Sequence, residues 1–507
     1  MPVAVNRVAE ITPAIDRAAS VADLIELRLD YLSEDELATF GGSVDTLLDS
    51  SPVPLILTLR PADEGGRSNL DLARRLAFWS NLPKRSDCNF DLELSIAERL
   101  AGKLTDFDWA RVICSHHDFA SVPSDLKEIY RRMEATPAGI LKIAVMAKDA
   151  IDCLPVFEIL NTGNVRNRET IAIAMGEAGI MTRILGPSHG SFLTYGPTDS
   201  AKGTAPGQIT AEQLRDCYRI DRIDEATEVF GLVGRPVSHS ISPQIHNALM
   251  REASLNSVYI PFEVGDVDSF FGRMVHACSR ETDLNMRGLS VTAPHKVSVM
   301  RHLDWIHDSA KGIGAVNTIV IKGRELQGYN TDADGFVAPL RERFGSLKKL
   351  RCAIIGAGGA ARAALWALGK EGAAATLFVR DQKKAQATAD SLGAEIESVS
   401  GADFKDFDLV VNATPAGTRG EFEYQSPAKA GQLRNVRLVY DLVYNPLETP
   451  LLREARSAGC ETLGGLEMLL AQAAVQFNLW TGKKAEPKVA RAAATEALTR
   501  MHHISTV

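Results

Sequence analysis

Short apolar runs alternate with helical patterns through roughly the first 220 residues of the chain. Between these runs, stretches such as 69–82, 124–135 and 150–161 place apolar residues three and four positions apart, as an amphipathic helix does. Eight alternating β/α units are typical of a (β/α)8 barrel, and an open doubly wound sheet is the main alternative. The eight predicted strands are Val3–Val8, Leu24–Leu29, Leu55–Leu59, Phe90–Leu94, Val112–Cys114, Leu141–Met146, Thr170–Met175 and Phe192–Tyr195.

The pattern changes after a predicted closing helix at Ile209–Tyr218, where a charged, unpatterned linker follows. A strand at Val229–Val233 opens a second α/β stretch, and a strand at Arg351–Ile355 leads into a glycine loop. The last two predicted helices, Gly465–Leu479 and Pro487–Met501, should pack back on the earlier part of this stretch. We therefore expect a barrel over 1–219 and a two-subdomain α/β unit over 228–507, with a Rossmann-type nucleotide-binding subdomain at 336–464 and a substrate subdomain at 228–335 plus 465–507.

Composition and charge are those of an ordinary globular protein. The 507 residues are 45% hydrophobic and 24% charged, and the net charge of −8 gives no global basic field for nucleic acid. Seven cysteines lie scattered without a CxxC pair, which argues against a disulfide framework or a zinc site. The sequence has no apolar span of membrane length and no signal-like segment after Met1. We expect no nucleic-acid, membrane or metal partner, and a cytoplasmic location.

Charged side chains stand at the ends of the predicted barrel strands. Glu26 and Arg28 share one face of their strand, since side chains alternate along it, and His117 ends another. The ends of barrel strands converge on one mouth, where the active sites of barrel enzymes lie. The charged set expected there is Glu26, Arg28, Arg60, Glu64, His117, Lys142 and Arg183.

Lys142 is the most informative of these residues because it lies inside an apolar strand. Burial is costly for a lysine unless it is paired or neutral, and we expect burial and the nearby arginines to favour the neutral amine. A neutral amine attacks ketones to give an imine, and His117 could then remove a proton from the adjacent carbon. Taken singly, Lys142 could instead reach solvent from an edge strand, and His116 with His117 could bind a metal, although neighbours on a strand point to opposite faces.

Six segments of this half resemble type I 3-dehydroquinate dehydratase: ELRLD (26–30), TLRPADEGG (58–66), SHHDF (115–119), LKIAVM (141–146), MGEAGIMTR (175–183) and TAPGQ (204–208). The resemblance implies that Lys142 forms the imine with the substrate ketone, that His117 is the general acid and base, and that Glu64 assists the histidine. It also implies that the substrate carboxylate and hydroxyls are held by Glu26, Arg28, Arg60, Arg183, Thr204 and Gln208. Thr204 stands where many bacterial members have serine, and it keeps the hydroxyl.

The second half contains a glycine loop in the context that a dinucleotide site requires. The loop 356–361 fits G-x-G-x-x-A between a strand and a helix, so a pyrophosphate can approach the helix N-terminus. After the next strand, Arg380, Lys383 and Lys384 suit a 2′-phosphate, whereas Asp381 could bond a free 2′-hydroxyl. The cations favour NADP, and Asp381 leaves NAD open.

A second polar constellation precedes this loop. The segments SHSISP (238–243), VTAPHK (291–296), GAVNT (314–318) and NTDADG (330–335) combine short hydroxyl and amide side chains that suit a polyhydroxylated ring. Lys296 and Asp332 could form a proton-transfer pair for the interconversion of an alcohol and a ketone. Singly, Ser240 or Ser242 could cap a helix, Asn317 could be a turn residue and Asp332 a helix cap.

These segments resemble shikimate dehydrogenase, as do NATPAG (412–417), YDLVYNP (440–446) and GLEMLLAQAA (465–474). The resemblance implies Lys296 and Asp332 as the catalytic pair, and substrate binding by Ser240, Ser242, Thr292, Asn317, Tyr444 and Gln472. It implies nucleotide binding by Gly356, Gly358, Gly359, Ala360, Arg380 and Lys384, with Asn412 and Thr414 beside the nicotinamide. Both serines of the pair at 240 and 242 remain, which favours shikimate over quinate, and Asp381 departs from the threonine or serine common in the family.

The two resemblances together predict a bifunctional enzyme of the shikimate pathway, which serves aromatic amino-acid biosynthesis. The first half would dehydrate 3-dehydroquinate to 3-dehydroshikimate, and the second would reduce that product to shikimate with NADPH. The alternatives are a Schiff-base aldolase fused to an unrelated reductase, a chain in which one half is a non-catalytic binding module, and a quinate oxidase.

Overall fold

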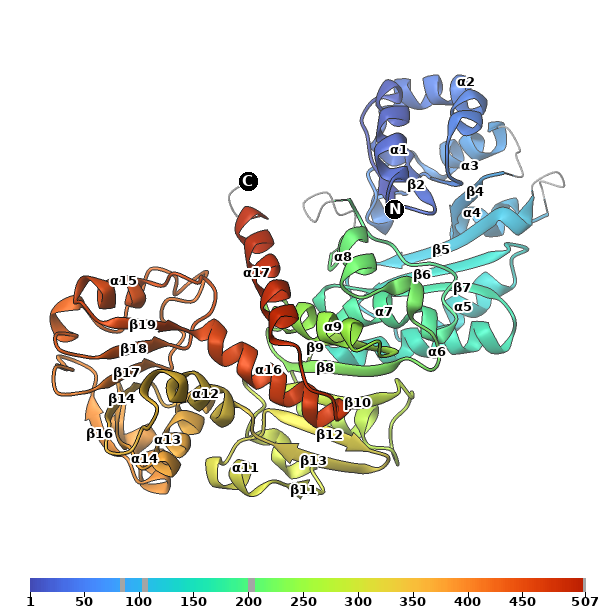
Figure 1. Cartoon of the computed structure of the whole chain (residues 1–507). Coiled ribbons are helices and arrows are strands. Elements are labelled where there is room, and N and C mark those ends of the chain that lie inside the picture. Colours follow the sequence, from blue (N-terminus) through green and yellow to red (C-terminus); the bar gives the residue numbers. More distant parts are fainter. Residues whose placement is uncertain (83–86, 103–107, 199–205, 505–507) are drawn as a thin grey trace. The chain divides into compact units, whose positions relative to one another are not determined.

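The computed structural model describes residues 1–82, 87–102, 108–198 and 206–504, and the chain divides into two compact units (Figure 1). The first unit comprises Met1–Glu228 and Asn256–Asn285, and the second comprises Val229–Leu255 and Met286–Val507. No helix of the described ranges is both long and apolar enough to cross a membrane.

The first unit is built on a seven-stranded sheet whose strands follow one another in sequence order and pair in parallel. The strands are β1 (Pro2–Val3), β2 (Ile25–Arg28), β3 (Leu55–Thr58), β4 (Asn89–Glu93), β5 (Val112–Asp118), β6 (Ile140–Met146) and β7 (Glu169–Met175). The connecting helices are α1 (Ile11–Ala19), α2 (Glu34–Ser50), α3 (Leu72–Asn81), α4 (Leu94–Leu100), α5 (Leu126–Glu134), α6 (Leu154–Val165) and α7 (Ile180–Leu185), and α8 (Ala211–Asp216) follows. Sequential parallel strands joined by helices agree with the predicted barrel class.

The eighth predicted strand, Phe192–Tyr195, is not a strand in the structure. Among the described residues it meets β7 only at the bridge between Thr170 and Ser191, next to a 2.9 Å hydrogen bond from the Phe192 amide to the Thr170 carbonyl. Gly190 before it takes a φ of +76°, and Gly196-Pro197 after it ends the extended stretch, so no long ladder forms. Tyr195 nevertheless packs with isoleucines of four strands in the barrel interior.

The second unit contains a mixed sheet in which strands run in the order β11-β13-β12-β10-β8. β10 is parallel to β8 and antiparallel to β12, which forms a hairpin with β13. The bounds are β8 (Glu228–Gly234), β10 (Met286–Val291), β11 (Trp305–Ile306), β12 (Thr318–Lys322) and β13 (Glu325–Tyr329). Two helices of this part matter for the site, α9 (Ser242–Glu252) and α12 (Asp332–Phe344).

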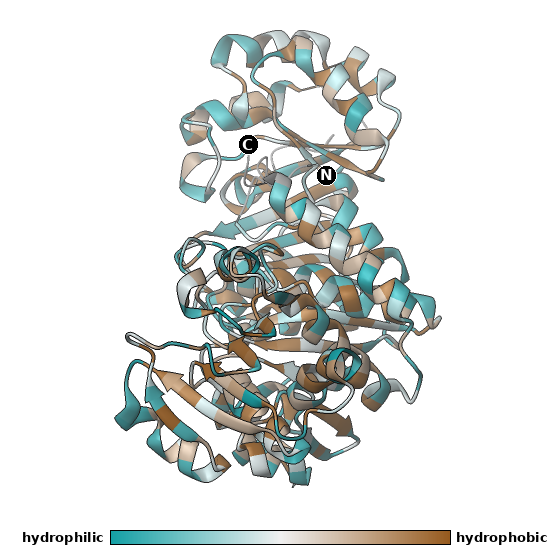
Figure 2. Cartoon of the chain, turned by 60° about the vertical axis from the view of Figure 1, so that its left-hand side comes forward, coloured by the Kyte–Doolittle hydropathy of each residue, from teal (hydrophilic) through white to brown (hydrophobic). Residues whose placement is uncertain are grey.

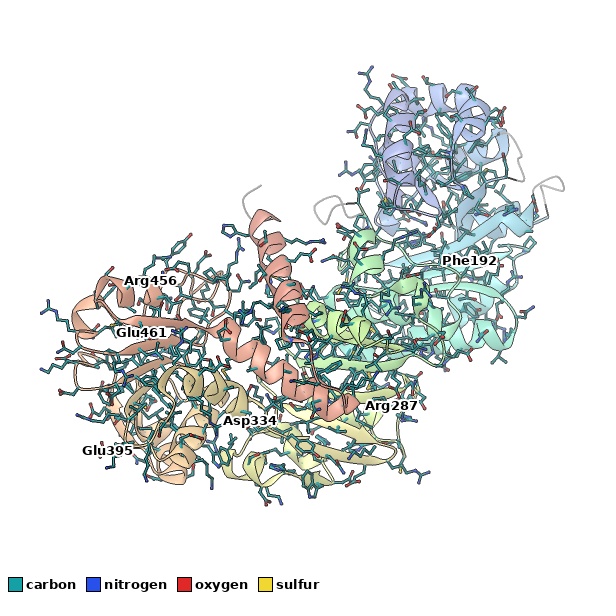
Figure 3. The ribbon with its side chains drawn as sticks, in the orientation of Figure 1. Phe192, Arg287, Asp334, Glu395, Arg456 and Glu461 are labelled. Atoms are coloured by element: carbon teal, nitrogen blue, oxygen red, sulfur yellow. The ribbon has the colours of Figure 1, made fainter. Side chains whose placement is uncertain are left out.

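A second sheet in this unit is fully parallel, with the order β16-β15-β14-β17-β18-β19. In chain order this is 3-2-1-4-5-6, the Rossmann arrangement, whose switch point lies between β14 and β17. Glu395 and Glu461 begin two of its strands, and both are exposed, as is Arg456 on a helix beside the sheet (Figure 3). The strands are β14 (Arg351–Ile355), β15 (Ala374–Val379), β16 (Glu395–Ser398), β17 (Leu409–Asn412), β18 (Leu438–Asp441) and β19 (Glu461–Gly464), with helices α13 (Gly359–Glu371), α14 (Gln382–Leu392) and α15 (Pro450–Ser457).

The closing helices α16 (Gly465–Thr481) and α17 (Pro487–Ile504) pack back on the earlier elements of the second unit. α16 lies against α12 and α17 against α9, as the sequence predicts. Figure 2 shows apolar strands between helices that carry both polar and apolar positions. Because one face of α16 is buried against α12, the packing determines which of its side chains face the neighbouring site.

Gly356, the first residue after β14, has a backbone conformation that a larger residue should not tolerate. Its φ is +111°, and an added Cβ would lie 2.8 Å from Cγ2 of Thr414, so Gly356→Ala should lower the free energy of unfolding by about 1–3 kcal/mol. Gly358 has a φ of −76° and open space around an added Cβ, so Gly358→Ala is the matched control. Denaturant unfolding without nucleotide measures both, and equal stability of the two variants would contradict this reading of the loop.

Candidate active sites

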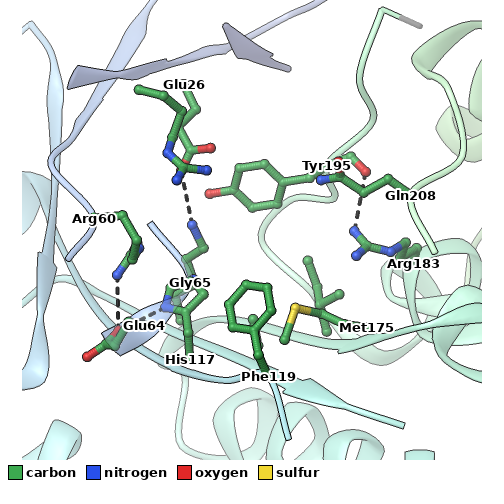
Figure 4. Close-up of a pocket in the computed structure, with 14 residues that line it drawn as sticks. Glu26, Arg60, Glu64, Gly65, His117, Phe119, Met175, Arg183, Tyr195 and Gln208 are labelled. Atoms are coloured by element: carbon green, nitrogen blue, oxygen red, sulfur yellow. Dashed lines mark hydrogen bonds and ion pairs between the residues drawn. The ribbon is translucent and has the colours of Figure 1, made fainter. Parts of the chain in front are cut away.

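A pocket toward the C-terminal ends of the barrel strands gathers the charged residues predicted there (Figure 4). It also receives two residues from the segments after α7, Tyr195 and Gln208. Thr204, the remaining predicted residue, lies outside the described residues. The predicted residues that line the pocket are Glu26, Arg28, Arg60, Glu64, His117, Lys142, Arg183 and Gln208.

Lys142 is held as a cation by two carboxylates. Its Nζ lies 2.8 Å from Oδ2 of Asp91 and 3.1 Å from Oε1 of Glu26. Burial alone would lower the pKa of Lys142, but the two carboxylates outweigh it and raise the pKa above its usual value. The expectation of a neutral amine in the resting site is therefore wrong, and Lys142 must lose a proton before it can act as a nucleophile.

Asp91 is the central residue of this site that the sequence reasoning missed. Its Oδ1 accepts hydrogen bonds from Arg60 at 2.7 Å and from Ser115 Oγ at 2.6 Å, while Oδ2 pairs with Lys142. Burial opposes its charge, but Arg60 and Lys142 lower the pKa of Asp91 below its ordinary value. The signal was present in 89–93, where polar and apolar residues alternate along β4 as they do around Glu26.

His117 is neutral and paired with Glu64. Its Nδ1 lies 3.2 Å from Oε2 of Glu64, which also accepts from Arg60 at 3.3 Å. Burial lowers the pKa of His117 well below its usual value, and the cations of Arg60 and Lys142 lower it further. Burial raises the pKa of Glu64 to about 7. A neutral imidazole at neutral pH can accept a proton, as a general base must.

Arg28 and Arg183 differ in what they contact. Arg28 makes a bidentate ion pair with Asp30, both N–O distances being 2.8 Å, whereas Arg183 is fully buried with no carboxylate partner in the part of the chain that the structure describes. Its NH1 donates a 3.5 Å hydrogen bond to the Tyr195 carbonyl, and burial lowers the pKa of Arg183 to about 10. An unpaired buried guanidinium is a ready site for a carboxylate ligand.

The second unit places Lys296 and Asp332 in direct contact. Nζ of Lys296 lies 2.5 Å from Oδ2 of Asp332, and Nδ2 of Asn317 donates to Oδ1 at 2.8 Å and to Oε1 of Gln472 at 3.2 Å. Asp332 thus orients the ammonium while Asn317 orients the carboxylate. The predicted residues that line the adjoining pocket are Ser240, Ser242, Thr292, Lys296, Asn317, Tyr444 and Gln472.

Three polar residues of this pocket were not predicted: His239, Ser290 and Gln476. Gln476 accepts from Ser290 Oγ at 3.2 Å and donates to Thr318 Oγ1 at 3.0 Å. The signal for Gln476 was its spacing of four residues from Gln472, which puts both amides on one face of α16.

A larger pocket lies at the carboxyl ends of the Rossmann strands and shares His239 and Tyr444 with the pocket that Lys296 lines. It is lined by Ala360 of the glycine loop and by Thr414, so both predicted residues face it. The positive φ of Gly356 and the open space beside Gly358 leave room for a pyrophosphate at the start of α13. These features fit a dinucleotide.

Asn412 forms hydrogen bonds to the loop that lines this pocket. It is fully buried, and its Nδ2 donates to Asp441 at 2.9 Å and to the Ala416 carbonyl at 3.0 Å, while Oδ1 accepts from Thr414. Its hydrogen-bonding groups are therefore committed to the loop. Thr414 lines the pocket and Asn412 is bonded to it, and their place beside the nicotinamide stays a prediction.

Arg380, Asp381 and Lys384 lie at the exposed start of α14. Asp381 is the helix N-cap, and its Oδ1 accepts from the Lys384 amide at 3.2 Å. A carboxylate oxygen used in this way supports the helix, as aspartate commonly does at this position. No group of three or more metal-ligating side chains comes together within the described ranges.

Family models match both halves of the chain. The type I 3-dehydroquinase model matches residues 1–225, the shikimate dehydrogenase substrate-binding domain matches 232–319, and the shikimate 5′-dehydrogenase C-terminal domain matches 465–495.

Relatives of similar length combine the same two parts. The chloroplastic bifunctional 3-dehydroquinate dehydratase/shikimate dehydrogenase of Arabidopsis thaliana is 34% identical over 91% of this chain and 78% of its own length. The shikimate biosynthesis protein AroDE of Chlamydia pneumoniae is 30% identical over 93% of this chain and 92% of its own. A crystal structure of shikimate dehydrogenase in complex with NADP+ matches with a TM-score of 0.51 at 37% identity, covering 54% of this chain and 97% of that chain.

Asp441 generates a pH prediction for the second site. Burial raises the pKa of this fully buried carboxyl to about 6, although Thr449, the Val443 amide and Asn412 donate to it. A raised carboxyl pKa stabilises the fold below the unfolded pKa of 3.8, and this stability is lost as pH rises through about 6. Between about pH 4.5 and 7.5 the free energy of unfolding of the native chain should fall by roughly 2 kcal/mol more than that of the Asp441→Asn variant. Denaturant unfolding checks this, and parallel pH curves would contradict it.

Proposed function

Because the chain belongs to the bifunctional 3-dehydroquinate dehydratase/shikimate dehydrogenase family, we propose that it catalyses two consecutive steps of shikimate synthesis. The barrel, residues 1–219, dehydrates 3-dehydroquinate to 3-dehydroshikimate, and residues 228–507 reduce that product to shikimate with NADPH. The observation that carries this proposal is that each half brings one buried or half-buried lysine against carboxylates inside a polar pocket.

In the first step, Lys142 attacks the substrate ketone after it passes a proton to a neighbouring carboxylate, Asp91 or Glu26. The imine withdraws electrons from the adjacent carbon, and His117 removes a proton from it because its imidazole is neutral. Glu64 holds Nδ1 of that histidine and so selects the nitrogen that reacts. The substrate carboxylate binds the unpaired guanidinium of Arg183, and Gln208 with Thr204 holds its hydroxyls.

In the second step, Lys296 and Asp332 together deliver a proton to the substrate oxygen. Lys296 donates to the oxygen that becomes the alcohol, and Asp332 keeps the ammonium in place at 2.5 Å. The nucleotide supplies a hydride when it is bound. Ser240, Ser242, Thr292, Asn317, Tyr444 and Gln472 bind the ring hydroxyls and carboxylate around the same pocket.

The cofactor is NADPH rather than NADH. Arg380 is an exposed cation at the end of β15, where Rossmann proteins contact the ribose, and Lys384 is an exposed cation in the first turn of α14. Asp381 already caps α14. The relatives named for NADP+ support the same choice. We place the enzyme in the cytoplasm, although the plant relative is chloroplastic.

A coupled assay tests the two-step function. NADPH oxidation should begin on addition of 3-dehydroquinate, with 3-dehydroshikimate as the intermediate. Lys142→Ala should abolish oxidation with 3-dehydroquinate and keep it with 3-dehydroshikimate, because only the imine step is removed. Lys296→Ala should reduce turnover of 3-dehydroshikimate by about 100-fold or more and leave dehydration intact. Each variant is the control for the other, and normal coupled turnover by Lys142→Ala would refute the assignment.

The cofactor assignment is tested at Arg380 and Asp381. Arg380→Ala should lower kcat/KM for NADPH by about 10-fold, which is the loss of one charge-assisted contact, and change that for NADH little. Asp381→Asn is the matched control, because asparagine also caps helices. If Asp381→Asn instead lowers kcat/KM for NADH, the carboxylate reads the ribose and the assignment to capping alone is wrong.

A further inference from the structure

Tyr195 occupies the position where the eighth barrel strand would lie, and it brings a hydroxyl into the first pocket. Its side chain is 5% exposed and lines that pocket. Its ring packs in the barrel interior with a cluster of five isoleucines: Ile56, Ile113, Ile140, Ile171 and Ile173. This packing uses the ring alone, so a phenylalanine would fill the same space.

The hydroxyl of Tyr195 has no acceptor for its proton in the described part of the chain. The Lys142 ammonium contacts the ring of Tyr195, its Nζ being 4.4 Å from the ring centroid, but an ammonium only donates. Leaving a buried hydroxyl unpaired costs about 1–3 kcal/mol of stability. This unpaired hydroxyl lies beside Lys142, and the packing of the tyrosine ring does not require it.

A second unpaired group lies in the same pocket. Nε of Arg183 is buried without a hydrogen-bond partner, while its NH1 reaches the carbonyl of Tyr195 itself. In Figure 4 the Tyr195 ring crosses the pocket with its hydroxyl toward the side where Glu26 lies, away from Arg183. Glu26 in turn lies 3.1 Å from Nζ of Lys142. A ligand that binds Arg183 through its carboxylate would therefore meet the hydroxyl near the reacting nitrogen.

On the basis of the dehydratase function proposed above, we propose that Tyr195 is a catalytic residue whose hydroxyl donates a hydrogen bond to the substrate ketone oxygen during imine formation. In that step the Lys142 nitrogen bonds to the ketone carbon, and the C–O π electrons move to oxygen. Two of the three ammonium protons leave with that oxygen as water, by way of the neighbouring carboxylates, and a protonated imine remains. Atoms and charge balance, and the donated hydrogen bond stabilises the negative charge that develops on oxygen.

The ionisation of Tyr195 is consistent with a donor that keeps its proton. Burial raises the pKa of the phenol above its usual value, and the Lys142 cation offsets only part of that rise. The hydroxyl is therefore protonated throughout the range in which the enzyme would work, and it acts by hydrogen bonding without transferring its proton.

Tyr195→Phe separates the hydroxyl from the ring. With the full chain, 3-dehydroquinate and rapid borohydride quenching, the rate of adduct formation at Lys142 should fall by about 10–100-fold, as for loss of one oxyanion donor. The melting temperature should stay the same or rise, because an unpaired buried hydroxyl is removed. An unchanged adduct rate overturns the proposal, and so does a fall in melting temperature of several degrees, which would make the hydroxyl structural.

Tyr440→Phe is the matched control. The Tyr440 hydroxyl is also buried and unpaired among the described residues, its ring stacks on Phe336 at 5.5 Å, and it lines none of the three pockets described above. Its adduct rate should equal that of the native chain. If the native chain itself forms no adduct, the dehydratase function fails; if it does and Tyr195→Phe is equally fast, only the role of Tyr195 fails.

Discussion

Mutual neutralisation of buried charges inside the barrel is the interaction on which the first active site depends. Asp91 on β4 accepts from Arg60, which follows β3, at 2.7 Å and from Lys142 on β6 at 2.8 Å. Each of these ions alone would cost several kcal/mol to bury, whereas together they stay charged within the apolar interior. The same contacts that fix the positions of the side chains therefore also fix where the protons lie before substrate arrives.

This charge network changes the picture of the lysine chemistry. A neutral Lys142 would be a nucleophile at rest, but the structure stores the residue as an ammonium between Asp91 and Glu26. In the proposed mechanism, the nucleophile is produced only when a carboxylate takes a proton from Lys142, and that proton then leaves in the departing water. The second unit uses a related device, since Asp332 holds the Lys296 ammonium beside a polar pocket. Each half thus holds one lysine by carboxylate contact: the buried Lys142 by two carboxylates and the half-buried Lys296 by one.

Residues that line the two polar pockets could be predicted from the sequence because each interrupts an apolar pattern. Lys142 and His117 stand on strands of a regular α/β alternation, and the glycine loop marks the Rossmann subdomain directly. The charge state of Lys142 could not be predicted, because it depends on carboxylates of two other strands. The prediction of an eighth strand was wrong for a local reason, because Gly190 and Gly196 bound a segment whose residues otherwise favour β structure. Asp91 was missed because a single carboxylate in a strand is informative only once its neighbours are known.

The protonation state of Lys142 in the free enzyme tests this account most directly. Selective isotope labelling of lysine side chains, with Lys142→Arg to assign the signal, would allow NMR to follow the Lys142 side chain from about pH 6 to 11. Lys142 should stay protonated up to at least the ordinary lysine pKa of about 10.4. Asp91→Asn should lower that value, because it removes the closest carboxylate. Titration of Lys142 near neutral pH in the native chain would contradict the account.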